Sequence, residues 1–492
     1  MRVAVIGAGP AGMTAALQLS RGGVDVDVYE AGTSVGGMSR SLDLWGQRVD
    51  LGPHRFFSTD ERVNQLWLDV VGQDHAMVHR LTRIYYGGRF YRYPLRPLNA
   101  FWNMGPAEAV LCLASFVKER VRPSYSTDDN TSFESWVVGR FGRRLFERFF
   151  RSYSEKLWDI PCGELSADFA AQRIRKLSLL EAARSAFSPE RGRKHKTLVD
   201  CFSYPLGGTG SVYERMVDLV RGYGGRVHLD SRVQRILHTA TEVEGVELPT
   251  GDVETYDHIV STMPLTNLIR GLSDAPQEVQ AAADALQFRN TILVYVHVDS
   301  DSLFSDQWLY IHEPGLNMGR VTNFRNWVPE LYGDARTTVL AVEYWCNDSD
   351  AVWTGGDEPL IEQATRELRS SGLLRDEPVL DGHVVRIKRC YPVYRHGYSD
   401  HVELIADYLR DFQGLTPIGR YGTFKYNNQD HSILMGILAA ENLLDGRDHD
   451  LWHVNTDHDT YQEEEVIMDG CLAARREATE GELAIAGHLI SD

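Results

Sequence analysis

The first thirty residues constrain this chain more than any other segment. Residues 3–6, VAVI, predict a short buried strand, and the turn after them, GAGPAG, places Gly7, Gly9 and Gly12 in G-x-G-x-x-G spacing. A stretch of helical periodicity follows, and a second predicted strand ends at Glu30. Gly7 makes a tight turn, Gly9 lets the backbone approach a pyrophosphate, Gly12 allows close helix–strand packing, and Glu30 can accept a ribose hydroxyl. The segment therefore predicts a Rossmann-like dinucleotide-binding unit.

A second glycine pair selects between the common dinucleotides. The run AGTSVGGMSRS places Gly36 and Gly37 a few residues after Glu30. FAD is longer than NAD, and its pyrophosphate and ribityl chain need more contact with the backbone, so this arrangement predicts FAD. No second G-x-G-x-x-G follows a strand elsewhere in the sequence, so we expect no built-in NAD(P) domain.

Composition excludes several classes of protein. The chain has 492 residues, enough for roughly two or three domains, and its net charge of −18 argues against nucleic acid as a partner. The six cysteines form no CxxC pair, which is typical of reduced thiols and predicts neither a disulfide framework nor a metal site. The first apolar run belongs to the glycine motif, so no signal peptide is expected. No apolar stretch approaches the ~20 residues of a transmembrane segment, and we expect a cytoplasmic protein.

The glycine pattern resembles the FAD-binding superfamily that contains the amine oxidases, protoporphyrinogen oxidase and the UDP-galactopyranose mutases. Two more segments follow in the order that this superfamily shows. GGRVHLDSRVQRI at 224–236 is similar to the strand region whose Val233 position meets the adenine through its backbone. DHIVSTMPL at 257–265 is similar to the strand that returns to the nucleotide domain.

Three further segments resemble the UDP-galactopyranose mutases in particular. LGPHRFFSTDERVNQLW at 51–67 is similar to their histidine loop, and residues 132–168 are similar to a substrate-domain helix with its Lys-x-Trp turn. GRYGTFKYNNQDHS at 419–432 is similar to their Gly-Arg-x-Gly-Thr loop. Together with the amino-terminal motif, the resemblance covers most of residues 1–445 in colinear order. It implies FAD as cofactor and a nucleotide sugar as substrate.

The resemblance also implies roles for single residues. His54 would lie against the flavin face and Arg420 near both flavin and sugar, so these two are the catalytic candidates. For His54, Trp158 and Tyr391 the alternative is a purely structural role in a loop, a core or a sheet. The substrate-binding candidates are Trp158, Arg173, Tyr391 and Tyr426; another alignment puts Lys176 in place of Arg173.

The loop at 419–432 precedes an apolar run with helical character. In the resembled enzymes this helix points its amino terminus at the pyrimidine edge of the flavin, where its dipole stabilises negative charge. Asp430 or Ser432 could also cap the helix. The residues expected to contact FAD are Gly7, Gly9, Ala11, Gly12, Glu30, Gly37, Met38, Ser39, Arg40, Pro53, His54, Val233, Arg420, Asp430, His431 and Ser432.

One position departs from the family pattern. The mutases have a diphosphate-binding arginine shortly after a Glu-Tyr pair on a strand, and here VLAVEYWCND places Cys346 there. A bound diphosphate would need another cation, for which Arg386, Lys388 and Arg389 are the candidates.

The expected fold is α/β: a Rossmann-like FAD-binding domain, an inserted helical domain and a substrate-domain β-sheet. The expected bounds are 1–80, 190–265 and 400–445 for the FAD domain, 95–190 for a helical substrate or lid domain, 266–399 for the sheet and 446–492 for a helical extension. The apolar run AEAVLCLASFV at 107–117 is expected to be a core helix, with a monotopic membrane contact as the alternative.

Three function classes remain open at this point. The first is a pyranose–furanose mutase acting on a nucleotide sugar, in which N5 of reduced flavin is the covalent nucleophile. The second is an FAD-dependent oxidase, desaturase or reductase of a sugar, a polyprenol or another small metabolite. The third is a flavin-binding protein without turnover. We expect an external electron donor such as NAD(P)H or a reductase, and the sequence leaves a homo-oligomer open.

Overall fold

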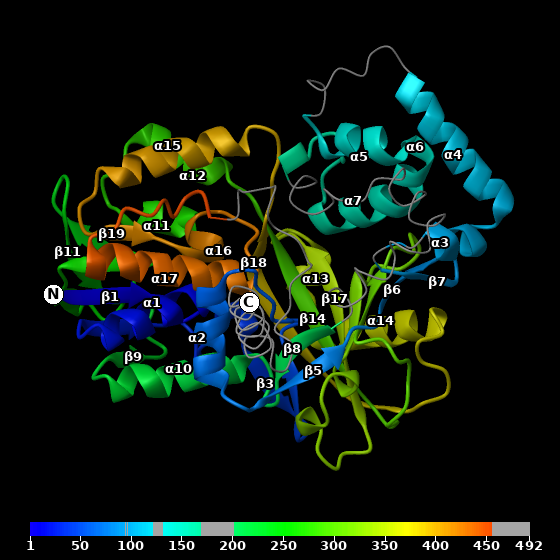
Figure 1. Ribbon diagram of the computed structural model, residues 1–492, viewed down its shortest axis with the longest axis horizontal. Coiled ribbons are helices and arrows are strands. Elements are labelled where there is room, and N and C mark those ends of the chain that lie inside the picture. Colours follow the sequence, from blue (N-terminus) through cyan, green and yellow to red (C-terminus); the bar gives the residue numbers. More distant parts are fainter. Residues whose placement is uncertain (94, 96, 122–130, 169–200, 455–492) are drawn as a thin grey trace, which may run out of the picture.

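The computed structural model describes residues 1–93, 95, 97–121, 131–168 and 201–454. Two sheets and a helical unit make up this part of the chain, and Figure 1 shows the first sheet beside the amino terminus and the second sheet across the molecule from it.

A five-stranded parallel sheet forms the nucleotide domain. Its order is β19-β13-β1-β2-β9, so the two strands of the amino-terminal motif lie next to each other. The first strand alternates between two cores, because Val3 and Val5 pack against α1 and α17 while Ala4 and Ile6 face the opposite side. The strands are β1 (Arg2–Ile6), β2 (Asp25–Tyr29), β9 (Arg226–His228), β13 (His258–Ser261) and β19 (Leu415–Pro417).

Helices cover both faces of this sheet. The most extensive helix–helix contact joins α1 and α17. Gly436 allows this close approach, since a Cβ there would lie 2.6 Å from the Ala11 carbonyl oxygen. One face carries α1 (Pro10–Arg21), α2 (Glu61–Val71), α10 (Gly210–Gly222) and α17 (Gln429–Asp445). The other carries α11 (Leu265–Gly271), α12 (Gln277–Ala285) and α15 (Tyr398–Arg410), with the small sheet β10 (Arg235–His238), β11 (Val243–Glu247) and β12 (Val253–Thr255).

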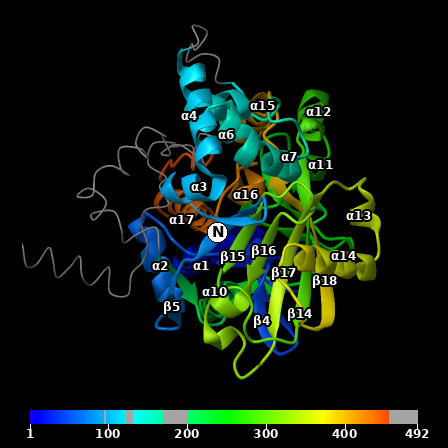
Figure 2. The same cartoon turned by 90° about the vertical axis from the view of Figure 1, so that its right-hand side faces the viewer.

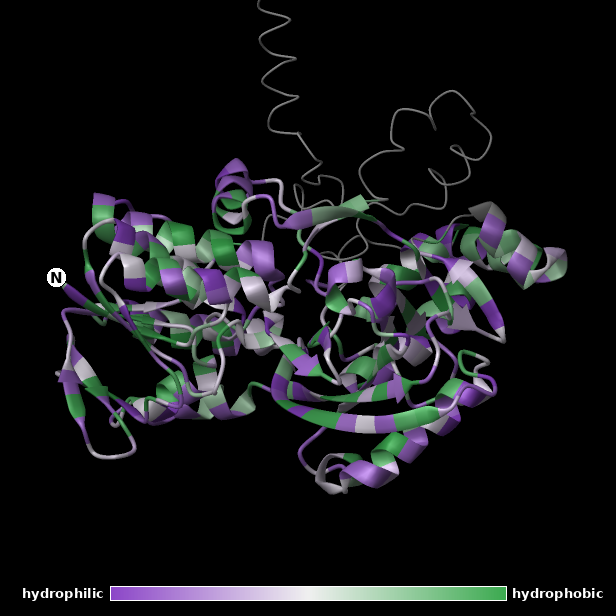
Figure 3. Ribbon diagram, turned by 90° about the horizontal axis from the view of Figure 1, so that it is seen from below, coloured by the Kyte–Doolittle hydropathy of each residue, from purple (hydrophilic) through white to green (hydrophobic). Residues whose placement is uncertain are grey.

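A seven-stranded mixed sheet forms the second unit. One face packs on α13 (Ala351–Thr354) and α14 (Asp357–Ser370), which lies along the sheet in Figure 3. Two of its strands, at 82–86 and 89–92, lie between the expected FAD segment 1–80 and the expected helical domain 95–190. The expected domain bounds therefore left them unassigned. In spatial order the strands are β18 (Val379–Pro392), β14 (Phe288–Val298), β17 (Thr338–Cys346), β16 (Arg320–Asn323), β15 (Trp308–Ile311), β6 (Thr82–Tyr86) and β7 (Arg89–Arg92).

The helical unit lies beyond the last two strands of this sheet. Its helices are α3 (Pro97–Met104), α4 (Pro106–Val121), α5 (Phe133–Phe141), α6 (Arg143–Leu145), the π-helical turn Phe146–Arg151 and α7 (Ser152–Trp158). Two small antiparallel sheets connect the units: the hairpin of β3 (Ser41–Leu44) and β4 (Gln47–Asp50), and the pair of β5 (His75–His79) with β8 (Cys201–Pro205), which are far apart in sequence. The short helix α16 (Gly419–Gly422) precedes α17.

The expected fold class is confirmed, but the expectation for α4 is wrong. Among its described residues only Cys112, Phe116 and Glu119 are buried, so it is no core helix. In the part of the chain that the structure describes, no helix is both long and apolar enough to cross a bilayer. The five cysteines in the same part form no disulfide.

Candidate active site

A cavity of about 1030 Å³ lies between the two sheets. Its wall combines the β1–α1 turn, the segments near Gly37 and His54, the loop around Val233, the amino-terminal end of α17 and one face of the second sheet. The carboxyl ends of the parallel strands β1 and β13 therefore open into it, which is where open α/β sheets bind ligands.

The three motif glycines are needed for different reasons. Gly7 has a φ of +95°, and a Cβ there would lie 2.1 Å from Thr262 Oγ1. A Cβ at Gly12 would lie 1.9 Å from the Gly7 carbonyl oxygen. At Gly9, by contrast, the nearest atom to an added Cβ is 3.9 Å away, at Gly37, and φ is −78°. Protein packing therefore explains Gly7 and Gly12, whereas Gly9 keeps open a part of the cavity that fits a pyrophosphate.

Glu30 stands at the end of β2 and lines the cavity. Its carboxylate accepts the backbone N–H groups of Ala8 and Gly32, both at 2.8 Å. These bonds hold the carboxylate beside the glycine turn, at the place where the ribose hydroxyl of a dinucleotide is expected.

The amino-terminal end of α17 also faces the cavity, through Asn428, Gln429 and Ser432. Asn428 is the N-cap and forms a capping box with His431, so the cap is neither of the residues proposed from the sequence. Asp430 and His431 are buried and do not line the cavity. The helix end still presents its first backbone N–H groups to the site, where they favour negative charge.

His54 lies in the cavity wall, within range of the positive charges of Arg320 and Arg420. Burial, together with the positive charges of Arg320 and Arg420, lowers the pKa of His54 to about 3. Among the described residues its Nδ1 atom has no hydrogen-bond partner. The imidazole is therefore neutral at physiological pH.

The cavity is also lined near His54 by an arginine that the sequence reasoning missed, Arg320. Arg320 Nε donates to Glu343 Oε1 at 2.6 Å, and a second guanidinium nitrogen donates to Oε2 at 2.7 Å. The two residues are register partners on β16 and β17. Burial alone would lower the pKa of Arg320, but the Glu343 carboxylate outweighs it and raises that pKa well above its ordinary value. One signal was present in the sequence: Glu343 interrupts an apolar strand, and a buried carboxylate needs a cation or several donors.

The pleat of β17 explains Cys346. Glu343 faces the cavity, whereas Tyr344 and Cys346 pack in the core beside α14. An arginine at position 346 would therefore point away from the cavity. Arg386 is also excluded as a replacement, because it donates to the carbonyl oxygens of Trp353 and Gly355 on the α13–α14 side.

The other two replacement candidates belong to a basic rim of the cavity, which comprises Arg232, Arg270, Lys388 and Arg389. Arg389 has a φ of +56°, and its backbone N–H donates to Asn290 Oδ1 at 2.8 Å. Burial and the charges of Arg270 and Arg232 lower the pKa of Arg389. Arg270 pairs with Asp284 at 2.7 Å and Lys388 lies 3.9 Å from Asp348, whereas the Arg389 guanidinium forms no ion pair with a described residue.

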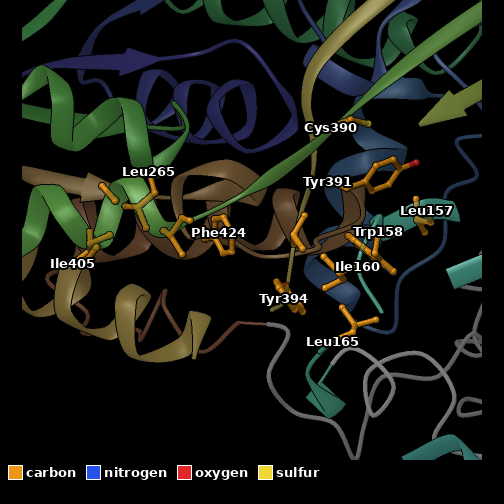
Figure 4. Packing of buried hydrophobic residues seen from close by; sticks show 14 of the residues in the cluster. Leu157, Trp158, Ile160, Leu165, Leu265, Cys390, Tyr391, Tyr394, Ile405 and Phe424 are labelled. Atoms are coloured by element: carbon orange, nitrogen blue, oxygen red, sulfur yellow. The ribbon is translucent and has the colours of Figure 1, made fainter. Parts of the chain in front are cut away.

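Arg420 and two tyrosines form the remaining wall. Tyr391 and Tyr426 stack with ring centroids 5.5 Å apart, and the Arg420 guanidinium lies over both rings. Arg420 donates to the carbonyl oxygens of Cys390 and Asn427. Trp158 packs edge-on against both tyrosines and is not among the residues that line the cavity, so it supports this wall from outside. Figure 4 shows Trp158 beside Tyr391.

Most of the residues proposed from the sequence come together here. Gly12, Arg40 and Trp158 lie outside the cavity lining, as Asp430 and His431 do, and Arg173 and Lys176 lie outside the described residues. Those that line the cavity are Gly7, Gly9, Ala11, Glu30, Gly37, Met38, Ser39, Pro53, His54, Val233, Tyr391, Arg420, Tyr426 and Ser432.

Comparison with known proteins decides the family. A family described as flavin containing amine oxidoreductase matches residues 10–398, which is most of the chain. The chain belongs to this family. FAD is its cofactor, and the open space at Gly9, the anchored Glu30 and the helix end at Asn428 fit that molecule.

Two curated relatives match part of this chain. The chain is 30% identical over 192 residues to the zeta-carotene desaturase of Solanum lycopersicum, covering 34% of this chain and 33% of the relative. It is 23% identical over 275 residues to a 1-hydroxycarotenoid 3,4-desaturase of Flavobacterium, covering 50% and 53%. The chain thus spans about a third to a half of these relatives.

Among solved structures, reduced UDP-galactopyranose mutase superposes with a TM-score of 0.81 at 22% identity, covering 95% of this chain and 98% of the other. A protein described as a putative protoporphyrinogen oxidase from Exiguobacterium gives a TM-score of 0.71 at 16% identity, with 91% and 99% coverage.

Proposed function

We propose that this flavoprotein is a pyranose–furanose mutase that acts on a nucleotide sugar. The observation that supports this most is the polar, cationic cavity beyond the glycine motif. Arg320 and Glu343, the stacked Tyr391 and Tyr426, and the basic rim all face it. A hydrocarbon substrate would offer no hydrogen bonds to this polar wall, whereas a sugar diphosphate supplies acceptors for its guanidinium, ammonium and hydroxyl groups.

The wall nearest His54 would bind the sugar. Arg320 is held by both oxygens of Glu343, so its guanidinium orientation is set before a substrate arrives. The tyrosine hydroxyls of residues 391 and 426 would donate to the sugar or to its phosphates, and neutral His54 would accept or donate one hydrogen bond without adding charge.

The basic rim would bind the diphosphate. Arg389 has no carboxylate partner among the described residues, and its two arginine neighbours raise the electrostatic cost of an empty rim. A diphosphate would relieve that repulsion and supply charge-assisted acceptors. In this proposal the basic rim replaces the arginine that the UDP-galactopyranose mutases have where this chain has Cys346.

When bound, FAD would supply its reduced N5 atom as the covalent nucleophile, and the net reaction would be an isomerisation. The protein's part is to bind and orient the sugar, to keep water away from the reacting face through the Trp158–Tyr391–Tyr426 wall, and to stabilise negative charge with the α17 terminus.

Product analysis tests this proposal. Purified holoenzyme would be incubated with UDP-galactopyranose and other nucleotide sugars, with and without dithionite, and the products separated by chromatography. We expect an isomer of equal mass to form only with reduced enzyme, while the flavin spectrum stays reduced. Net oxidation of a substrate with flavin reduction, or no product from any nucleotide sugar, would overturn the proposal.

A second candidate is an FAD-dependent oxidoreductase with an external electron donor or acceptor. The printed names of the curated sequence relatives, which are desaturases, favour it. Anaerobic mixing of oxidised enzyme with a candidate substrate distinguishes the two, because only an oxidoreductase would bleach the flavin near 450 nm in a single turnover.

A further inference from the structure

The helical unit carries a concentration of exposed apolar side chains that the active site does not use. Six of the fourteen large hydrophobic residues exposed in the described part of the chain lie on α3 and α4. We call them the apolar ridge: Trp102, Val110, Leu111, Leu113, Val117 and Val121. Such a concentration marks an interaction surface, because scattered single residues are the norm on soluble proteins.

Helix α4 is apolar on two opposite faces. Cys112, Phe116 and Glu119 are buried on the side that packs on α5 and α6. Val110 and Val117, spaced for one helical stripe, are 62% and 51% exposed on the other side. At about 100° per residue these two sets lie roughly opposite each other. An apolar helix face is normally covered by other parts of the protein, and here the face with Val110 and Val117 has no cover among the described residues.

The apolar ridge is suited to lying on a membrane surface and not to spanning a bilayer. Sixteen residues of α4 extend for about 24 Å, and no described helix qualifies as a membrane span. Trp102, 73% exposed on the neighbouring α3, is the type of residue that settles at a membrane–water interface. Figures 1 and 2 both show α4 at the periphery of the molecule, where a flat surface can reach it.

Charge selects the kind of surface. Lys118 and Arg120 are exposed in the last turn of α4, next to the ridge. Among the described residues between Arg89 and Trp158, ten are basic and five acidic, in a chain with a net charge of −18. In a symmetric dimer formed through this face, each basic unit would meet its own copy and be repelled, whereas anionic lipid headgroups complement its charge.

We propose that α3 and α4 dock this protein on the surface of an anionic lipid bilayer, with the apolar ridge in the headgroup region and α4 parallel to the membrane plane. The protein would then be a peripheral membrane enzyme, and its cavity would serve substrates at or near that surface.

Vesicle co-sedimentation with the full-length holoprotein tests this docking. The probes are vesicles of phosphatidylcholine alone and of phosphatidylcholine with phosphatidylglycerol, at low and high salt. We expect wild type to partition at least tenfold more strongly to the anionic vesicles, and the binding to fall several-fold as salt rises. Wild type that stays in the supernatant with both vesicles would overturn the proposal.

A matched pair of variants locates the contact. Leu113→Glu/Val117→Glu places two charges on the ridge, and Val253→Glu/Leu444→Glu places the same two charges at exposed positions elsewhere. We expect at least a tenfold loss of vesicle binding in the first pair alone, with the flavin absorbance of both pairs unchanged. Equal vesicle binding by the two variant pairs would overturn the proposal. It would also be overturned if wild type formed a dimer in light scattering, the ridge variant did not, and neither bound vesicles.

Discussion

The two ends of the cavity are built from different parts of the polypeptide. At the end lined by Gly7 and Gly9, the backbone of the glycine turn shapes the wall, and Gly12 supports that turn from outside the lining. At the end formed by Arg320 and Glu343, the backbone is an ordinary antiparallel ladder and the side chains make the site. Substitutions that add side-chain volume should therefore damage the first end most, and substitutions that remove a charge should damage the second end most.

This difference separates binding a cofactor from selecting a substrate. The glycine turn, which we call the backbone cradle, binds the pyrophosphate that is common to many dinucleotide enzymes, and it tolerates few substitutions. A sheet face presents one side chain per register position, so substitutions there alter chemistry without altering the fold. The four predictions below test the contrast, beginning with the largest expected effect.

Gly12→Val is expected to abolish both folding and FAD retention. Its Cβ would lie 1.9 Å from the Gly7 carbonyl oxygen, and backbone atoms there cannot move aside. Gly9→Val is the matched control, because the protein around Gly9 has room for a Cβ and only the cofactor would lose its space. Flavin absorbance and thermal melting of both variants measure the outcome. If Gly12→Val were yellow and stable, the cradle would not depend on volume.

Arg320→Met should destabilise the protein by about 3–5 kcal/mol, because it leaves the Glu343 carboxylate buried without its cation. Arg320→Met/Glu343→Leu removes both charges and should recover most of that loss while remaining inactive. Urea unfolding of wild type and the two variants gives the free energies. A double variant no more stable than the single one would show that the pair does not act as a unit.

Arg420→Ala is expected to lower kcat/KM by about one to two orders of magnitude, since a charge-assisted hydrogen bond contributes roughly 1.5–3 kcal/mol. Tyr426→Phe removes only a hydroxyl and should mainly raise KM, by about tenfold or less. Steady-state kinetics on the substrate that the product analysis identifies gives both values. A greater loss of kcat in Tyr426→Phe than in Arg420→Ala would reverse the roles assigned to them.

His54→Gln should change the pH dependence of stability rather than its value at neutral pH. The folded-state pKa of His54, about 3, lies below its unfolded value of about 6.5. Its contribution is therefore complete above pH 6.5 and is lost as pH falls toward 3, by ~1.4 kcal/mol per pH unit. Chemical unfolding between pH 7 and 5 should show a steeper decline for wild type than for His54→Gln. Parallel curves would show that His54 protonates normally in the folded protein.

The sequence predicted the cradle closely because local geometry determines it. A strand, a glycine turn, a helix and Glu30 occur in one short stretch, and each has its own signature. The loop at 419–432 was also placed beside the cavity, although Asn428 rather than Asp430 or Ser432 caps its helix.

The sheet wall could not be predicted in the same way. Arg320 lies on a four-residue strand, and the face it shows depends on its pairing with β17. Counting residues after Glu343 led to Cys346, which the pleat directs away from the cavity. The prediction that α4 is a core helix was wrong for a related reason. The hydrophobicity of a segment does not reveal which faces of its helix pack against the rest of the chain.

The strand order of the nucleotide sheet has a consequence for biosynthesis. β1 and β2 leave the ribosome first, but they lie between β13 and β9, and the sheet ends at β19, near residue 415. At ~5–20 residues per second, roughly 20 s to more than a minute separates the first strand from the last. During that interval the nascent chain has a glycine turn without the helix end that completes the flavin site. Flavin loading therefore waits for α17 to be synthesised, and ribosome-bound fragments that stop before α17 should remain colourless.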